Sequence, residues 1–159
     1  MTCRTYETGT LKTYKYVVIL SEYQGKILLS RHKKRTTWET QGGHIEPGET
    51  PMEAAKRELF EESGALEFEL EPLCDYWAGE EGTDDWANGM VFRAVIRSLG
   101  PIPDSEMAQV ESFDVLPGNL TYPAITPVLF AYAAAHSRDS STAGMVKEST
   151  RMVQTADMA

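Results

Sequence analysis

The sequence of 159 residues lacks most of the features that mark membrane, secreted or disulfide-stabilised proteins. Its longest unbroken apolar run, residues 128–135, is eight residues long, whereas a membrane-spanning helix needs about 20. The first ten residues contain no apolar segment typical of a secretory signal, so we expect a cytoplasmic protein. The two cysteines, Cys3 and Cys74, are too few for a disulfide framework or a four-thiolate metal site. They are expected to be free thiols.

Positive charge is also scarce. The chain has 15 Lys and Arg residues against 24 Asp and Glu residues, which gives a formal net charge of −9. Such a charge repels long polyanions unless the cations are concentrated in one place. We therefore expect a small-molecule ligand rather than polymeric nucleic acid, and we expect the acidic residues to gather around a cation.

The composition, 42% hydrophobic and 25% charged, is typical of one globular domain. Runs rich in apolar residues predict strands at 14–20, 26–30, 66–77 and 90–99. Thr-Pro pairs predict helices at 51–63 and about 126–136, the first supported by Glu53 in a capping box and by Gly64 at its end. We place the domain at residues 1–136 and expect a tail or weak terminal helix at 137–159. The tail has four apolar residues in a seven-residue repeat that would suit a homodimer contact: Met145, Val146, Met152 and Val153.

Three acidic residues of the first predicted helix, Glu58, Glu61 and Glu62, are spaced so that their carboxylates share one face. Taken alone, they are more typical of a solvated acidic surface than of a metal site. The glycines ahead of the helix, Gly42 and Gly43, permit a sharp backbone turn and can expose a carbonyl oxygen toward the same point. An oxygen-only set of ligands suits Mg²⁺, which completes its coordination with water and substrate phosphate oxygens.

The spacing of these residues resembles the Nudix box, GX5EX7REUXEEXGU, in which U is a bulky aliphatic residue. Every fixed position is filled, by Gly43, Glu49, Arg57, Glu58, Glu61, Glu62 and Gly64, although Ala65 is smaller than the usual final residue. The segment 38–43 is similar to the family's W-x-x-P-G-G sequence, with Gln41 in place of proline. Residues 106–117 resemble a later acidic strand of the family.

The resemblance implies an α/β fold, namely an α/β/α sandwich with a mixed β-sheet in which the box forms a loop, a helix and a loop. It implies that Glu58, Glu61, Glu62 and the carbonyl oxygen of Gly43 bind Mg²⁺, with Mn²⁺ as an alternative ion. Arg57 and Glu49 would orient these ligands. The general base differs among Nudix branches, and the candidates here are Glu58, Glu106 and Glu111.

Nudix proteins hydrolyse a nucleoside diphosphate linked to another group, and this chain is most similar to the MutT-type branch. That branch converts nucleoside triphosphates, including 8-oxo-dGTP, to a monophosphate and pyrophosphate. The alternatives are hydrolysis of ADP-ribose or nucleotide sugars, pyrophosphohydrolysis at RNA 5′ ends, and a non-catalytic regulatory module. The acidic net charge argues against RNA, and the complete set of box carboxylates argues against the regulatory module.

A basic segment precedes the box and supplies candidates for substrate binding. Arg31, Lys33, Lys34 and Arg35 place four of the 15 formal positive charges within five residues, which suits a triphosphate or an exposed basic turn. Trp38 offers an aromatic face to a nucleobase, or a ring that packs against the sheet. We expect Arg31, Lys33, Arg35 and Trp38 to bind the substrate.

Overall fold

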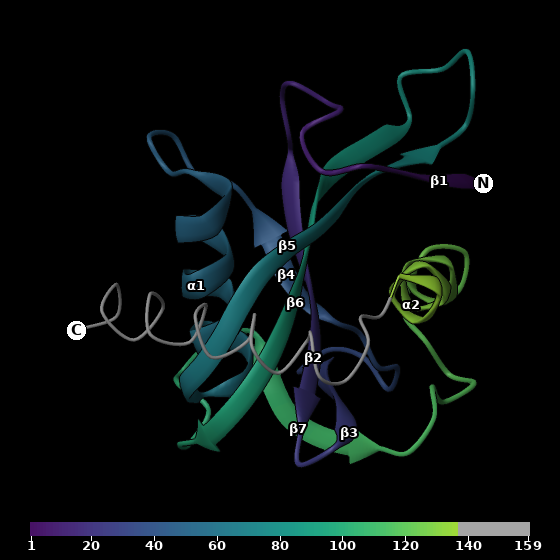
Figure 1. The fold of residues 1–159 in the computed structure, drawn as a ribbon. Helices are drawn as coiled ribbons and strands as arrows, with labels where there is room; N and C mark the ends of the chain where they lie inside the picture. The colour runs from purple at the N-terminus through teal and green to yellow at the C-terminus, as the bar shows by residue number, and fades with distance from the viewer. Residues whose placement is uncertain (137–159) are drawn as a thin grey trace.

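The apolar runs of the sequence form one mixed sheet with a helix on each face, as the computed structural model shows for residues 1–136 (Figure 1). The elements are β1 (Thr2–Tyr6), β2 (Tyr16–Tyr23), β3 (Lys26–His32), β4 (Gln41–His44), α1 (Pro51–Ser63), β5 (Ala65–Gly79), β6 (Trp86–Leu99), β7 (Met107–Phe113) and α2 (Thr126–Ala135). This architecture confirms the α/β class. The tail expected at 137–159, with its apolar repeat, lies outside the described residues.

The order of the strands places a short glycine-rich strand at the centre of the molecule. The sheet runs β1-β5-β6-β2-β3-β7, with β2 and β6 parallel and the other pairs antiparallel. The ladder between β2 and β3 covers only residues 21–23 of β2, and β4 pairs with residues 16–19 of the same strand. One edge of β2 therefore serves two partners, and β4 leads directly into the loop before α1.

The predicted first helix is confirmed together with both of its end signals. The Thr50 side chain accepts a hydrogen bond from the Glu53 backbone N–H, and the Glu53 carboxylate accepts one from the Thr50 N–H. Gly64 ends the helix in the left-handed conformation, with φ of 79°, and its N–H donates to the Phe60 carbonyl. Local signals thus fix both ends of the helix that carries the acidic residues.

The two helices cover opposite faces of the sheet. Leu59 of α1 packs in a core with Val17 and Phe92, whereas Leu129 of α2 packs in a second core with Val91. Val91 and Phe92 are neighbours on β6, so their side chains point to opposite faces. Neither helix of residues 1–136 is long and apolar enough to cross a membrane.

β5 and β6 are longer than the predicted strands, and β1 and β4 were not predicted as strands from residue propensities. The connection between the strands predicted at 66–77 and 90–99 is shorter than expected, because β5 continues to Gly79 and β6 begins at Trp86. Within residues 1–136, β1 is an edge strand that pairs only with β5, and polar residues dominate it. β4 has the sequence QGGH, whose two glycines predict a turn rather than a strand. Its pairing with β2 depends on the tertiary fold rather than on strand propensity.

Candidate functional site

Arg57 lies at the centre of an ionic network beside the first helix. Its Nε and Nη2 donate to the two carboxylate oxygens of Glu49, at 2.7 and 2.9 Å, and its Nη1 donates to Glu58 Oε1 at 2.7 Å. Nη2 also donates to the His44 carbonyl at 3.1 Å, and Glu61 lies 3.6 Å from Nη1. The guanidinium therefore joins the end of β4 and the following loop to the acidic face of α1.

The carboxylates of Glu58 and Glu62 converge on the backbone of β4. The Gly42 N–H donates to Glu62 Oε1 at 2.7 Å. A Cβ atom added at Gly43 would lie 2.6 Å from Glu58 Oε1, so the glycine leaves the space that this carboxylate occupies. Two acidic side chains and the backbone of two glycines are thus brought together, as the spacing of the residues led us to expect.

Electrostatics make this arrangement costly for two free anions. Burial raises the pKa of Glu62 to about 8, even though the Gly42 N–H favours the charged carboxylate; Glu58, Glu39 and Glu106 raise it further. Burial also raises the pKa of Glu58, and the hydrogen bond from Arg57 opposes that rise. A bound divalent cation would stabilise both groups in their ionised form.

The oxygen donors around Gly43 suit a hard divalent cation that also binds water or phosphate oxygens. Within residues 1–136, no three His, Cys, Asp or Glu side chains are already grouped around a metal position. Glu58, Glu62 and the backbone oxygen of Gly43 offer a partial set of oxygen donors. Mg²⁺ characteristically binds one or two carboxylates and fills its remaining positions with water and phosphate oxygens.

Alanine at the two glycines of β4 should separate folding from the position of Glu58. A Cβ at Gly42 would lie 2.3 Å from the Val17 carbonyl oxygen, which the sheet holds in place, so we expect Gly42→Ala to lower the melting temperature by several degrees. The three atoms nearest to a Cβ at Gly43 belong to the flexible Glu58 side chain, so Gly43→Ala should keep the fold and weaken binding of Mn²⁺ about tenfold. Thermal melts and Mn²⁺ titrations measure both effects. Equal losses of stability in the two variants would contradict this assignment.

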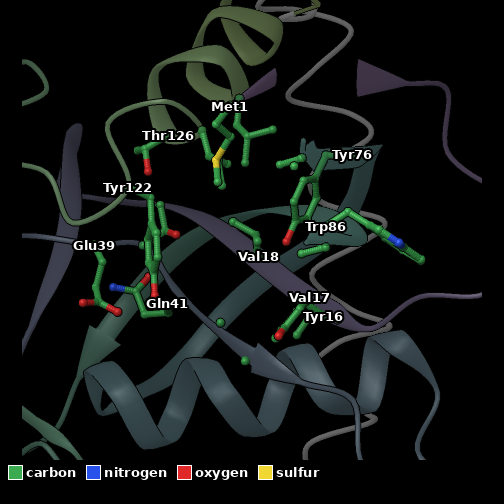
Figure 2. A pocket seen from close by; sticks show the side chains of 18 of the residues that line it. Met1, Tyr16, Val17, Val18, Glu39, Gln41, Tyr76, Trp86, Tyr122 and Thr126 are labelled. Carbon is green, nitrogen blue, oxygen red and sulfur yellow. The ribbon is translucent and has the colours of Figure 1, made fainter. Parts of the chain in front are cut away.

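A cavity of about 390 Å³ lies on the α2 side of β4 and shares its two glycines. Figure 2 shows Tyr122 on one side of this cavity and Tyr76 and Trp86 on the other. The floor is formed by β2, and Thr126 and Leu129 of α2 close another side; the lining includes Tyr16, Val17, Val18, Glu39, Gln41, Gly42 and Gly43. The backbone of β4 therefore lies between an aromatic cavity and the paired carboxylates.

The basic residues expected to bind the substrate are engaged with other side chains. Arg31 donates to Gln109 Oε1, and Lys33 Nζ lies 3.5 Å from Asp104. Arg35 Nη1 donates to Glu39 Oε1 at 3.1 Å. Of these basic residues, Arg35 alone contacts a residue that lines the cavity, since Glu39 is part of the lining.

Trp38 and Glu106 lie outside the cavity lining given above. Trp38 is 9% exposed and packs edge-on against the Phe113 ring at 5.1 Å between centroids, which corresponds to the packing alternative. Glu106 is exposed, lies 3.6 Å from His32 Nε2, and is close enough to Glu62 to raise the pKa of that residue.

Several residues at the site were not identified from the sequence. Glu39 is 8% exposed and accepts hydrogen bonds from Arg35 and from Thr121 Oγ1, which fixes the segment before α2 next to the loop before β4. Tyr76 and Tyr122 lie 46 positions apart in the chain and line the same cavity only in the folded protein. Glu39 was detectable only as part of the segment similar to W-x-x-P-G-G, and the two tyrosines follow no spacing that a sequence pattern would reveal.

Known proteins share this sequence pattern and fold. An RNA pyrophosphohydrolase of Francisella philomiragia is 29% identical over 85 residues, which is 54% of this chain and 50% of that protein, so the chain spans about half the length of the curated relatives it matches. The crystal structure of the Bacillus subtilis pyrophosphohydrolase BsRppH has a TM-score of 0.69 at 24% identity, covering 85% of this chain and 91% of that one. The NUDIX domain of Shewanella oneidensis NrtR, complexed with ADP ribose, has a TM-score of 0.62 at 16% identity, covering 84% and 94%.

These two structural likenesses concern the fold alone. The family itself is shown by the match of residues 12–120 to the model of the NUDIX domain, which includes the box, β2 to β7 and α1. The chain belongs to the Nudix family.

Proposed function

We propose that the chain is a Mg²⁺-dependent pyrophosphohydrolase that converts a nucleoside 5′-triphosphate to a monophosphate and pyrophosphate. One observation carries the proposal: the Gly42–Gly43 backbone borders both the Glu58 and Glu62 carboxylates and the aromatic cavity. A nucleotide whose base enters the cavity would bring its phosphates to β4, next to the paired carboxylates. The cavity volume of about 390 Å³ lies in the range of sites for small ligands.

The metal would be held by Glu58, Glu62 and the Gly43 carbonyl oxygen, with Glu61 as a further ligand. When bound, Mg²⁺ or Mn²⁺ supplies charge neutralisation at the phosphates and lowers the pKa of a coordinated water. Glu61 is more exposed than Glu58, with 46% of its side chain accessible against 13%. Glu61 would therefore bind the solvent-exposed side of the metal, whereas the less exposed Glu58 would determine its position.

Arg57 and Glu49 orient the carboxylates in this proposal rather than contact the substrate. The two parallel hydrogen bonds between them fix the plane of the guanidinium, which then presents Nη1 to Glu58 Oε1. Glu58 is thereby held on the side of the helix that faces Gly43. Lysine would not provide this geometry, because its ammonium group has no planar fork.

A carboxylate must accept the proton of the attacking water, and Glu106 and Glu58 are the candidates that the geometry favours. Glu106 has a side chain that is 81% exposed and lies outside the Arg57 network, although it is close enough to influence Glu62. Glu58 is nearer to the glycines, but one of its oxygens already accepts from Arg57. Glu111 is exposed on the outer strand β7 and is the weakest candidate.

RNA with a 5′-triphosphate is the second candidate substrate, because an RNA pyrophosphohydrolase is among the relatives. The net charge of −9 favours a free nucleotide over a polyanion. The test is a comparison of kcat/KM for nucleoside triphosphates, 8-oxo-dGTP, ADP-ribose, a nucleotide sugar and a triphosphorylated RNA oligonucleotide. We expect free triphosphates to be preferred; a preference for the RNA would replace the proposed substrate and keep the reaction.

Removal of the basic segment should affect triphosphates more than diphosphates. We expect replacement of Arg31, Lys33, Lys34 and Arg35 by serine to raise KM for a nucleoside triphosphate three- to tenfold, an effect of about 1 kcal/mol. Arg35→Ser alone should produce most of this change, because Arg35 contacts Glu39 at the cavity and neighbours Tyr122. The control is Lys26→Ser, at the opposite end of β3. Equal changes in KM for diphosphates and triphosphates would exclude a role of the segment in binding the terminal phosphate.

A further inference from the structure

Gln41, which replaces the usual proline ahead of the two glycines, is completely buried, and both polar atoms of its side-chain amide are hydrogen-bonded. Its Nε2 donates to the Leu28 carbonyl at 3.3 Å and to Ser30 Oγ at 2.9 Å. Its Oε1 accepts from Ser21 Oγ at 2.6 Å. These partners belong to β2 and β3, so the amide of Gln41 is fixed from two neighbouring strands.

Ser30 extends this network to the helix that carries the acidic residues. The Ser30 side chain is fully buried, and its Oγ donates to the backbone carbonyl of Glu62 at 2.8 Å. This carbonyl lies in the last turn of α1, where a carbonyl has no partner within the helix. The hydroxyl of Ser30 therefore accepts a hydrogen bond from Gln41 Nε2 and donates one to the Glu62 carbonyl.

Glu62 is held at a second point by the residue next to Gln41. The Gly42 N–H donates to Glu62 Oε1 at 2.7 Å, so the carbonyl and the carboxylate of Glu62 are both bound to groups that adjoin Gln41. Gln41 itself is neutral. It can fix the position of an acidic residue from a buried position without adding charge to the cluster of Glu39, Glu58 and Glu62.

We infer that Gln41 is a positioning residue, which holds the Glu62 carboxylate at the proposed metal site through Ser30 and Gly42. The inference rests on the proposed function, in which Glu62 is a metal ligand. Residues that orient metal ligands through hydrogen bonds typically change metal affinity 10- to 100-fold when they are replaced. The network around Gln41 should therefore affect metal binding more than the overall fold.

The test compares two serines that contact opposite ends of the same amide. Ser30→Ala removes the link to Glu62, whereas Ser21→Ala removes only the donor to Gln41 Oε1 and leaves both bonds from Nε2. Both serines are buried, with 0% and 3% exposure, which makes the substitutions closely matched. Gln41→Met, which keeps the length of the side chain and removes its hydrogen bonds, is the third variant.

The primary readout is the affinity for Mn²⁺, measured from the electron paramagnetic resonance signal of the free ion. We expect Ser30→Ala and Gln41→Met to weaken Mn²⁺ binding about 10- to 100-fold, and Ser21→Ala to change it less than about threefold. The combined Ser30→Ala and Gln41→Met variant should lose little beyond either single variant, because the two residues act in one chain of hydrogen bonds. Circular dichroism at the assay temperature verifies that each variant is folded.

A second readout distinguishes positioning from loss of structure. Ser30 does not belong to the cavity lining given above, so Ser30→Ala should raise the half-saturating Mg²⁺ concentration about 10- to 100-fold and leave the nucleotide KM at saturating Mg²⁺ nearly unchanged. Wild-type affinity for Mn²⁺ in Gln41→Met, or equal losses in Ser30→Ala and Ser21→Ala, would overturn the inference alone. Absence of Mn²⁺ binding by the wild-type protein would instead contradict the proposed function on which it rests.

Discussion

Glu62→Gln is expected to remove most of the metal-dependent hydrolysis and to leave the fold intact. Glutamine is nearly isosteric, and its amide oxygen can still accept the hydrogen bond from the Gly42 N–H. It has no negative charge to offer a divalent cation. We expect kcat/KM to fall about 100- to 1000-fold, the range found when an electrostatic group of an active site is lost.

The stability of the same variant provides an independent check. Because burial raises the pKa of Glu62 to about 8, the ionised carboxylate is unfavourable in the metal-free protein, and a neutral amide relieves this cost. We therefore expect the melting temperature of Glu62→Gln in EDTA to equal or exceed that of the wild type at pH 8. Glu67→Gln, an exposed residue just after the helix, is the matched control and should leave turnover unchanged. Wild-type turnover in Glu62→Gln would refute the metal assignment.

Arg57→Lys should have the second largest effect, even though it preserves the charge. Lysine loses the pair of parallel bonds to Glu49 and cannot at the same time reach Glu58 and the His44 carbonyl as the guanidinium does. The network is mostly shielded from solvent, since the side chain of Arg57 is 24% exposed and that of Glu58 is 13% exposed. We expect a loss of about 1–3 kcal/mol in the free energy of unfolding and a 10- to 100-fold loss of activity.

Urea denaturation and steady-state kinetics measure the two effects of Arg57→Lys. Arg4→Lys is the control, because Arg4 forms an exposed ion pair with Glu81 far from the box. A double-mutant cycle of Arg57→Lys with Glu49→Gln should show strong coupling, since the two side chains form one bidentate pair. Additive effects in this cycle would show that Glu49 and Arg57 do not act as a unit.

The sequence predicts α1 well because the signals at its ends are local. Thr50, Glu53 and Gly64 act within four residues of the helix ends, and the carboxylate face of Glu58 and Glu62 follows from the helical repeat. The spacing of these residues in the box also predicts that the two side chains converge on Gly42 and Gly43. The structure adds the contacts, which no spacing specifies.

The parts of the site that the sequence does not predict depend on contacts between distant segments. β4 pairs with β2 through glycines that have low strand propensity, and its position is set by close approach to the Val17 carbonyl. The charge of the basic segment predicts a phosphate-binding cluster. In the folded chain, however, Lys33 forms an ion pair with Asp104, and Arg35 forms one with Glu39. The cavity similarly combines Tyr76 of β5 with Tyr122 from before α2.

The most direct test of the account is an analysis of the products formed from a nucleoside triphosphate with and without Mg²⁺. Wild-type protein and Glu62→Gln are incubated with the substrate in parallel, and nucleotide, phosphate and pyrophosphate are separated by ion-exchange chromatography. The account predicts equal amounts of monophosphate and pyrophosphate from the wild type with Mg²⁺, and almost none after EDTA or in the variant. Release of inorganic phosphate, or hydrolysis that survives EDTA or the loss of the Glu62 carboxylate, would contradict it.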